Sequence, residues 1–313
     1  PFDRPRPEIQ AMDGESVRFT ISADRASALN RVAAASRSTL FMAMHAAFAV
    51  TLSKLSGSRD IVVGTPIAGR GEQELDQMIG QFANTLGLRL DVDPDSTFAD
   101  LVEQARGRDL AAFGNADVPF ERLVEAINPE RSTAYHPLFQ VGFSFQNLEQ
   151  ISLTLPGLEI SDLGVETGAA QFDLQLLVGA EEGGDGVTSA LDCALTFSTA
   201  LFDRSTADQL VERLLRVLDT VTEDPTVPVR AVDVLSDAEQ RTLIDSVNAT
   251  DRDGAPSLLS AMFTSQVAAT PDAVAVTFEG ESLTYAELGA RVARSARHLM
   301  ASGVGTGDLV AVA

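Results

Sequence analysis

The stretch Met78 to Leu90, read M-I-G-Q-F-A-N-T-L-G-L-R-L, decides how the surrounding chain is expected to fold. Read as a β-strand, with alternate side chains on opposite faces, it puts a single amide on a face that is otherwise apolar. That face carries Phe82, Asn84, Leu86, Leu88 and Leu90. A buried carboxamide costs about 1 to 3 kcal/mol unless it is hydrogen-bonded. The sequence therefore predicts that a structural partner or a substrate satisfies Asn84, and this stretch alone favours the structural partner.

The apolar periodicity on both sides of this stretch predicts a mixed α/β fold. Strands are expected at 17–21, 61–67, 139–145, 171–178 and 187–197, and the last two should form an antiparallel hairpin around the acidic, glycine-rich turn 181–186. Helices are expected at 24–36, 39–55, 98–105, 119–127 and 203–221. Ser96 and Thr97 are candidate caps for the third helix, and Asp117 for the fourth. The alternation of Phe139, Val141, Phe143 and Phe145 predicts that these four side chains share one face.

Two segments rich in proline and charge read as connections. Residues 1–14 predict a short linker, and residues 224–257 predict an interdomain linker with a helical insert at 238–247. A new pattern follows, with a helix at 258–268, a strand at 273–279 and a helix that begins at Thr284. Glu287 stands three residues after Thr284, the spacing of a capping box. We therefore expect one domain at 1–246 and the start of another at 247–313.

Charge and composition exclude several function classes. The 313 residues carry 23 basic and 45 acidic side chains, a net charge of −22 that disfavours nucleic acids and anionic membranes as partners. The longest apolar run, 40–52, is too short to span a bilayer and contains His45, so it predicts a buried helix. Lys54 is the only lysine, which argues against a lysine-based active site. Cys193 is the only cysteine, so the chain has no internal disulfide and a reducing cytoplasm is the expected location.

Generic catalytic patterns are absent from the sequence. It has no G-x-S-x-G elbow, no phosphate-binding loop with lysine, and no His or Cys spacing that would hold a metal. Core or surface roles are expected for His45 and His298, whereas His136 lies in a loop before Pro137. The first residue is Pro1, and the last apolar run, 309–313, resembles an unfinished strand, so a fragment of a longer protein is expected.

Three stretches together resemble a known family. I-G-Q-F-A-N-T-L-G-L-R at Ile79–Arg89 resembles the I-G-x-F-V-N-T-L-x-L-R motif of condensation domains from nonribosomal peptide synthetases. N-A-D-V-P-F-E at Asn115–Glu121 resembles their H-Q-D-V-P-F-E, and R-S-T-A-Y-H-P-L-F-Q at Arg131–Gln140 resembles their R-D-x-S-R-N-P-L-F. V-G-T-P-I-A-G-R at Val63–Arg70 and F-D-L-Q-L at Phe172–Leu176 also fit. The three motifs follow in the family's order and spacing.

A second resemblance begins after the predicted linker. S-L-T-Y-A-E-L at Ser282–Leu288 resembles the first core motif of adenylation domains, L-T-Y-x-E-L, carried here by Leu283, Thr284, Tyr285, Glu287 and Leu288. Condensation followed by adenylation is the order within an elongation module. The resemblance implies a chloramphenicol-acetyltransferase-like lobe, then a linker and the first segment of an adenylate-forming (ANL-type) domain.

This chain departs from the family pattern at several positions. The H-H-x-x-x-D-G motif, whose second histidine lies at the family's reaction centre, is absent from the sequence. Asn115 and Ala116 replace His-Gln, and Tyr135 and His136 replace Arg-Asn. The resemblance therefore implies that the chain contributes one wall of the reaction tunnel and does not condense alone.

The resemblance also implies residues, cofactors and partners. Asn84 is the expected support for the reaction centre, either hydrogen-bonding substrate or holding the catalytic loop of the other lobe. The other expected tunnel or motif residues are Gly80, Phe82, Thr85, Asp117, Pro119, Phe120, Arg131 and Pro137. Phosphopantetheine would be carried by upstream and downstream peptidyl carrier domains, and ATP with Mg²⁺ would serve the complete adenylation domain. The remaining partners would be the amino-terminal condensation lobe and the rest of the adenylation domain.

Two alternatives share this pattern. Epimerisation and heterocyclisation domains have the same fold, but their equivalent of the first motif lacks the F-x-N-T present at Phe82–Thr85. A second alternative is a non-catalytic platform for carrier and adenylation domains. Comparing peptide formation by the complete module with and without Asn84→Ala would separate catalysis from that platform role.

Overall fold

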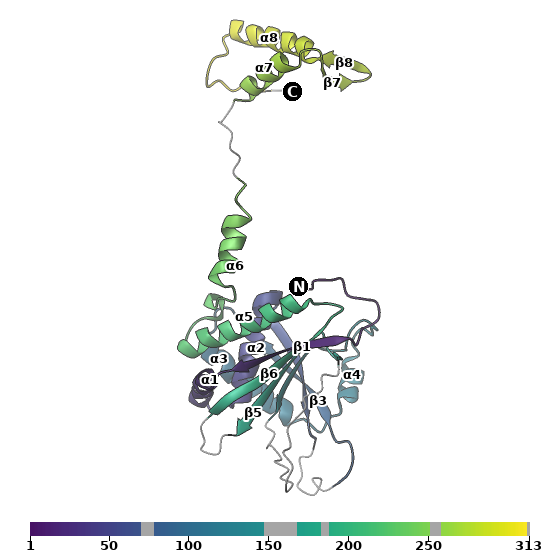
Figure 1. The fold of residues 1–313 in the computed structure, drawn as a ribbon, viewed down its shortest axis with the longest axis vertical. Helices are drawn as coiled ribbons and strands as arrows, with labels where there is room; N and C mark the ends of the chain where they lie inside the picture. Colours follow the sequence, from purple (N-terminus) through teal and green to yellow (C-terminus); the bar gives the residue numbers. More distant parts are fainter. Residues whose placement is uncertain (70–77, 147–167, 183–187, 251–257, 312–313) are drawn as a thin grey trace, which may run out of the picture. The chain divides into compact units, whose positions relative to one another are not determined.

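The computed structural model describes residues 1–69, 78–146, 168–182, 188–250 and 258–311. The chain divides into two compact units, Pro1–Gln240 and Arg241–Ala313 (Figure 1). Within the described residues, no single helix is long and apolar enough to cross a membrane. The helix pair Ala23–Ala35 and Leu40–Ser56 meets that length and composition only in combination, with a bend of 104° between the two helices.

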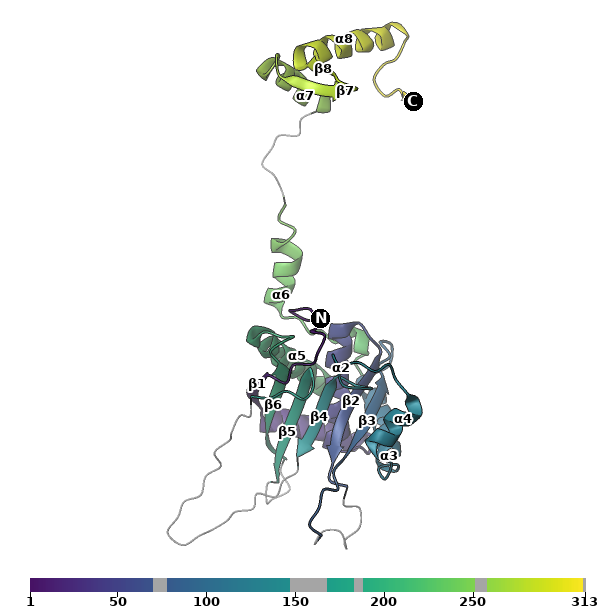
Figure 2. The same cartoon turned by 90° about the vertical axis from the view of Figure 1, so that its right-hand side faces the viewer.

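The first unit is built on one six-stranded mixed sheet with the order β1-β6-β5-β4-β2-β3 (Figure 2). The strands are β1 Gly14–Ile21, β2 Asp60–Ile67, β3 Asn84–Asp91, β4 Val141–Gln146, β5 Leu174–Glu182 and β6 Thr188–Ser198. β4 runs parallel to β2 and to β5, and all other neighbours are antiparallel. The predicted hairpin between β5 and β6 is confirmed, although its turn at 183–187 lies outside the described residues.

The longer helices of this unit lie against one face of the sheet, and Figure 2 looks onto the opposite face, here called the helix-free face. They are α1 Ala23–Ala35, α2 Leu40–Ser56, α3 Phe98–Phe113 and α5 Arg204–Glu223, with the short α4 Phe120–Ile127 beside β3. Ser22 caps α1, Thr39 caps α2, and Thr97 forms a capping box with Asp100 at α3. The mixed α/β class and the capping by Thr97 expected from the sequence are confirmed.

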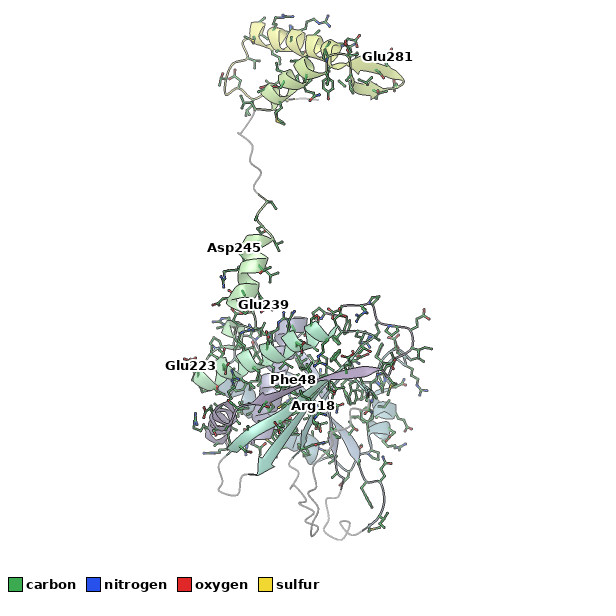
Figure 3. The ribbon with its side chains drawn as sticks, in the orientation of Figure 1. Arg18, Phe48, Glu223, Glu239, Asp245 and Glu281 are labelled. Atoms are coloured by element: carbon green, nitrogen blue, oxygen red, sulfur yellow. The ribbon has the colours of Figure 1, made fainter. Side chains whose placement is uncertain are left out.

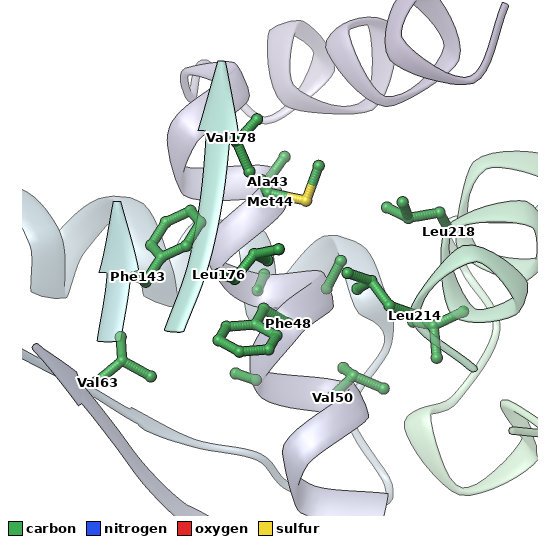
Figure 4. Packing of buried hydrophobic residues seen from close by; sticks show 14 of the residues in the cluster. Ala43, Met44, Phe48, Val50, Val63, Phe143, Leu176, Val178, Leu214 and Leu218 are labelled. Atoms are coloured by element: carbon green, nitrogen blue, oxygen red, sulfur yellow. The ribbon is translucent and has the colours of Figure 1, made fainter. Parts of the chain in front are cut away.

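The central helix α2 is buried along ten consecutive residues, Met42 to Thr51, as its unbroken apolar run predicts. Figure 4 shows Met44 and Phe48 of α2 among side chains from the sheet and from α5, including Phe143, Leu176 and Leu214. Leu86, Leu88 and Leu90 of β3 join the same core, so the apolar face predicted for this strand is confirmed from residue 86 onward.

The opposite face of the sheet carries glycine and polar residues where strands approach other groups closely. A Cβ at Gly64 would lie 1.9 Å from the ring of Phe139, and a Cβ at Gly142 would lie 2.8 Å from the ring of Phe172. Gly64 and Gly142 are paired across β2 and β4. The absence of side chains at this pair therefore allows the two phenylalanine rings to approach the sheet closely.

Three strand predictions need correction. The predicted strand at 171–178 begins only at Leu174. The predicted strand at 78–90 begins only at Asn84, because residues 78–83 are not in the β2–β3 ladder. The predicted strand at 139–145 begins at Val141, and Phe139 packs on the helix-free face instead of joining Phe143 in the core. Leu138 has φ of 69°, and this local reversal of the backbone breaks the two-residue alternation before the strand starts.

Neither end of the first unit is a free connection. Residues 1–13, here called the amino-terminal strap, are held against the unit by two ion pairs. Arg6 pairs with Asp173, and Arg4 pairs with Asp203. At the other end, Val229 and Val232 are buried, and Phe98 and Ala99 at the start of α3 donate to the carbonyls of Val227 and Pro225. The composition of residues 1–14 and of the segment from 224 predicted linkers. In the structure, ion pairs hold the first segment against the unit, and hydrogen bonds to the start of α3 hold the beginning of the second.

The second unit contains α7 Leu259–Ala269, a hairpin of β7 Val274–Phe278 and β8 Glu281–Thr284, and α8 Tyr285–Ala301. The expected capping box is confirmed, since Thr284 and Glu287 exchange side-chain and backbone hydrogen bonds. The helical insert is also confirmed as α6 Asp237–Arg241 followed by a π-helical turn, Thr242–Ser246. Residues 309–311 are not in a strand, and residues 312–313 lie outside the described residues.

Candidate functional site

Asn84 is the first residue of β3, and protein groups use its full hydrogen-bonding capacity. Its Nδ2 donates to the carbonyls of Ala116 at 2.9 Å and Val118 at 2.8 Å. Its Oδ1 accepts from the backbone N–H of Thr85 at 2.9 Å and of Phe120 at 3.0 Å. An amide side chain has two N–H donors and one oxygen with two lone pairs, so these four bonds satisfy it. The structural partner expected for Asn84 is therefore the turn between α3 and α4.

This arrangement replaces the cap that the sequence predicts for α4. The residue at the N-cap is Pro119, which makes no side-chain hydrogen bond there, so the prediction that Asp117 caps this helix is wrong. The N–H of Phe120 is one of the donors that a helix start leaves unpaired, and Asn84 accepts it from a separate strand. Asp117 is left exposed to solvent and its carboxylate is available to a ligand.

Phe120, whose backbone N–H is bound by Asn84, also contacts His136 through its ring. The two rings stack with centroids 5.4 Å apart and an angle of 27° between their planes. Phe139 and Phe172 complete the cluster, with centroids 4.8 Å and 5.2 Å from that of His136. Aromatic rings favour offset-stacked and edge-on contacts of this kind. The start of α4, the turn before β4 and the turn before β5 thus meet around one imidazole.

These segments line a cavity of about 760 Å³ where β2 ends and β3 begins. Six of the expected site residues line it: Phe82, Asn84, Thr85, Asp117, Pro119 and Phe120. Ile67 and Gly69 of the V-G-T-P-I-A-G-R stretch, Glu121 and His136 also belong to its wall. Among the described lining residues, the charged side chains are the carboxylates Asp117 and Glu121.

Gly69 shows why this wall needs glycine. Its φ is 64°, and a Cβ would lie 1.8 Å from the carbonyl oxygen of Phe82. A side chain at this position would therefore displace Phe82 from the wall of the cavity.

Three other predicted residues lie outside this cavity wall. Gly80 lies beside Phe82, whose ring is 3.2 Å from the place where a Cβ of Gly80 would stand. Arg131 and Pro137 line a neighbouring hollow of about 320 Å³ together with Tyr135 and residues at the end of α4. The third motif is thus divided, since His136 faces the larger cavity whereas Arg131 and Pro137 line the smaller one.

The last residue of the first motif, Arg89, forms a surface ion pair. Its Nε and Nη2 donate to the two carboxylate oxygens of Asp60 at 2.7 and 2.8 Å, between adjacent strands β3 and β2. The hydrogen bond from Arg89 holds the pKa of Asp60 below its ordinary value. Because both side chains are largely exposed, this pair fixes the β2–β3 edge only weakly.

The other candidate reactive groups are remote from the cavity wall. His45 is fully buried in α2, and its Nδ1 lies 3.1 Å from both carboxylate oxygens of Asp109 on α3, which confirms the expected core role. Cys193 is buried in β6, and burial, helped by the charge of Asp192, raises the pKa of its thiol to about 12. Within the described part of the chain, no three His, Cys, Asp or Glu residues cluster to hold a metal ion.

Two features of this region, the imidazole of His136 at the cavity and the pair of Arg6 and Asp173, are not evident from the sequence pattern. His136 departs from the asparagine of the family motif, and this departure was the available signal. The pair of Arg6 and Asp173 joins residues 167 positions apart, and local patterns carry no signal for such a contact.

The residues expected for the adenylation motif lie in the second unit. Leu283 and Thr284 end β8, and Tyr285, Glu287 and Leu288 open α8. In the described structure, Thr284 and Glu287 form the helix cap. The T-Y-x-E part of the motif therefore encodes a strand-to-helix transition.

Family models match both parts of the chain. The condensation-domain model matches residues 1–244, and the model of AMP-binding enzymes matches residues 263–313. A dimodular nonribosomal peptide synthase from Bacillus subtilis (strain 168) is 38% identical over 313 residues, covering all of this chain and 13% of that protein. Malpinin synthetase from Mortierella alpina is 40% identical over 313 residues, again over the whole chain, which spans 4% of that protein's length.

Solved structures agree with this assignment. The crystal structure of holo-AB3403, a four-domain nonribosomal peptide synthetase bound to AMP and glycine, matches 98% of this chain and 24% of its own, with a TM-score of 0.83 and 29% identity. The X-domain from teicoplanin biosynthesis matches 75% of this chain and 53% of its own, with a TM-score of 0.68 and 30% identity. The expected chloramphenicol-acetyltransferase-like fold is confirmed. The chain belongs to the condensation-domain family of nonribosomal peptide synthetases and continues into the beginning of an AMP-binding enzyme domain.

Proposed function

We propose that the first unit is the carboxyl-terminal lobe of a domain that forms an amide bond between two carrier-bound substrates. One observation carries this proposal: all three family motifs contribute to the wall of the 760 Å³ cavity, through Asn84, Phe120 and His136 respectively. These three residues are 16 to 52 positions apart in the chain, so their meeting serves packing or a common site, and an open cavity with apolar and polar groups in its wall favours a site.

In this proposal the cavity and the helix-free face of the sheet form one wall of a reaction tunnel. Phosphopantetheine arms on upstream and downstream peptidyl carrier domains would bring an amine and a thioester together there. Holding both reactants in register raises their effective concentration, which supplies much of the rate. The histidine of the H-H-x-x-x-D-G motif would come from the amino-terminal lobe, so the 313-residue chain is expected to be inactive alone.

Within this lobe we propose a positioning role for Asn84. Its four hydrogen bonds within the lobe support that role over direct binding of substrate. Phe82, Thr85, Asp117, Pro119 and Phe120 would line the tunnel wall. Gly80 would shape the turn before β3, and Arg131 and Pro137 would line its rim.

For the second unit we propose the start of an amino-acid-activating domain, with the boundary near 246. Leu259, Phe278 and Met300 leave 86%, 73% and 71% of their surface exposed in the described structure. Apolar side chains exposed to this degree on one small unit call for a covering partner, and the rest of the adenylation domain is that partner here. ATP and Mg²⁺ would bind to the complete adenylation domain, and the whole synthetase is expected in the cytoplasm.

A cavity-filling substitution in the full-length synthetase tests the tunnel proposal. Ala83 lines the cavity, so Ala83→Trp should obstruct it and lower the single-turnover rate of amide formation between preloaded carriers at least tenfold. Ala111→Trp on the exposed side of α3 is the matched control and should leave the rate unchanged. Circular dichroism and the melting temperature would show whether both variants fold.

The same pair of variants addresses the platform alternative. A lobe that serves only to dock carrier and adenylation domains would tolerate Ala83→Trp as well as it tolerates Ala111→Trp. Equal rates in the two folded variants would therefore contradict the tunnel proposal and favour the platform.

A further inference from the structure

His136 is held by aromatic neighbours from three directions. Phe120 stacks on it, Phe139 lies closest with a centroid distance of 4.8 Å, and Phe172 meets it edge-on at 71°. A ring fixed on several sides keeps its nitrogens in constant directions. The imidazole is therefore pre-oriented at the cavity wall, which favours a hydrogen-bonding role over simple packing.

The hydrogen bond of His136 selects its tautomer. Nδ1 lies 2.8 Å from the carbonyl oxygen of Pro137. A carbonyl oxygen only accepts, so Nδ1 must carry the proton of this bond. In the neutral ring the lone pair is then on Nε2, and this nitrogen accepts a hydrogen bond or a proton.

The charged groups around this imidazole either form ion pairs with other residues or line the cavity. Asp117 and Glu121, from the start of α4, line the same cavity as His136. On the β5 side, Asp173 follows Phe172 and is paired with Arg6 of the amino-terminal strap. On its own loop, Tyr135 lies under Arg6 with its ring centroid 5.8 Å from the guanidinium. The described titratable groups of the cavity are therefore acceptors of protons or hydrogen bonds.

The charged side chains of this wall, Asp117 and Glu121, suit the amine better than the thioester carbonyl. An amine presents N–H donors and becomes a cation when protonated, whereas a thioester carbonyl presents an acceptor and develops negative charge during attack. Resting on the proposed function, we propose that His136 binds the acceptor amine through Nε2 and accepts its proton before attack. His136 on this lobe is then a second proton-handling group, in addition to the histidine of the H-H-x-x-x-D-G motif on the amino-terminal lobe.

The step balances in atoms and charge. The ammonium group transfers one proton to Nε2 and becomes a neutral amine, while His136 becomes an imidazolium. The amine lone pair then forms the C–N bond to the thioester carbon, and the C–S bond breaks. The second amine proton goes to the departing thiolate, so that an amide and a thiol are formed. The imidazolium releases its proton to water.

The proton-accepting role proposed for His136 is specific to this chain, because it depends on a residue that differs from the family motif. The motif that Arg131–Gln140 resembles has asparagine at the position of His136. An asparagine side chain accepts a hydrogen bond through its amide oxygen but takes up no proton near neutral pH. His136→Asn therefore separates hydrogen bonding from proton acceptance, and His136→Phe removes both while keeping an aromatic ring in the cluster.

The first experiment measures the tautomer in the 313-residue chain itself. The chain has three histidines, so a spectrum with ¹⁵N-labelled histidine is simple, and His136→Phe assigns the signal. At pH about 8 we expect the proton on Nδ1 and a bare Nε2. A proton on Nε2 would overturn the proposal, and this result does not depend on condensation.

The second experiment measures single-turnover amide formation in the full-length synthetase with preloaded carriers. An α-amino group titrates near pH 8, so more of the amine is already neutral as the pH rises and a proton acceptor matters less. His136→Phe should lower the rate at least tenfold at pH about 7, and the defect should shrink toward pH about 9. His136→Asn should show the same trend, and His298→Phe in the second unit serves as the control.

The outcomes distinguish the two proposals. An unchanged rate in folded His136→Phe, or a defect of equal size at every pH, would overturn the role of His136 while leaving condensation intact. A wild-type synthetase that forms no amide from loaded carriers would instead overturn the proposed function, whatever the tautomer of His136.

Discussion

The side-chain oxygen of Asn84 accepts the backbone N–H of Phe120 at 3.0 Å, so a residue of β3 caps a helix that begins 36 positions later. The same side chain donates to the carbonyls of Ala116 and Val118, which lie in the turn before that helix. Asn84 thereby fixes the start of α4, and through the ring of Phe120 it fixes the position of His136. The first and second motifs thus support His136, a residue at which the third motif departs from the family pattern.

Asn84→Ala should release α4 from β3. It leaves two carbonyls and the N–H of Phe120 without their partner, and we expect a loss of about 2 kcal/mol of stability. Because α4 itself has no buried residues, the effect should be concentrated there. Hydrogen exchange at the amide of Phe120 should accelerate well beyond that at Phe98, the first residue of α3.

Asn115→Ala provides the matched control for this prediction. Asn115 is an exposed amide with one side-chain hydrogen bond, to the carbonyl of Ala111 at 2.8 Å. Its removal should change stability by less than about 0.5 kcal/mol. Equal effects of the two substitutions would show that the four bonds of Asn84 do not hold α4.

The contrast between Asn84 and its neighbours explains what the sequence could predict here. Leu86, Leu88 and Leu90 were predictable as buried because alternation is a local property of the strand. The need of Asn84 for partners was predictable from desolvation. Its partners in Ala116, Val118 and Phe120 were not, because they lie 32 to 36 positions away and are brought near only by the packing of α3 and α4.

Phe139 shows where a local pattern fails for a local reason. Its spacing from Val141 and Phe143 is correct for one strand face, yet it lies on the opposite face. The positive φ of Leu138 sets its direction, and the side-chain-free pair Gly64 and Gly142 provides the space. The site could therefore be located from its motifs, whereas its aromatic cluster required the three-dimensional structure.

Arg6→Ala should detach the amino-terminal strap. Arg6 donates to both oxygens of Asp173, one at 2.9 Å, and to the carbonyl of Ala134 at 3.2 Å, and only 20% of its side chain and 8% of that of Asp173 are exposed. Its removal leaves a buried carboxylate, so chemical denaturation should show a loss of about 3 kcal/mol.

Arg4 offers a matched arginine on the same strap. Its pair with Asp203 is 45% and 54% exposed, so Arg4→Ala should cost less than about 1 kcal/mol. Limited proteolysis should cleave within residues 1–13 faster in Arg6→Ala than in Arg4→Ala. The reverse order would contradict the assignment of Arg6 as the anchor of the strap.

Cys193 should make the chain less stable in alkali. Burial in β6 raises the pKa of its thiol from 9.0 to about 12, so between these values the folded chain keeps a proton that the unfolded chain loses. Stability must then fall as the pH rises above 9, by up to about 1.4 kcal/mol per pH unit from this group. Urea denaturation of wild type and Cys193→Ala at several pH values should show this extra slope only in the wild type. A thiol reagent that modifies the folded chain as fast as the unfolded chain would contradict the burial on which the argument rests.

Glu239 should give the opposite dependence on pH at α6 (Figure 3). Its Oε2 accepts from the N–H and hydroxyl of Ser236 at 2.7 and 2.9 Å, and its Oε1 accepts from Arg213 of α5 at 3.0 Å. The backbone hydrogen bond from Ser236, helped by Arg213, lowers the pKa of Glu239 from 4.5 to about 2. A lowered pKa contributes stability above pH 4.5 that is lost as the pH falls toward 2.

Glu239→Gln should therefore weaken the start of α6 at neutral pH by about 2 kcal/mol, measured by hydrogen exchange at the amides of 237–240. The difference from wild type should narrow as the pH is lowered from about 4.5, because protonation removes the same charge. Glu212→Gln, at an exposed position of α5, should show neither effect. A difference between wild type and Glu239→Gln that stays constant down to low pH would mean that the charge of Glu239 does not fasten α6 to α5.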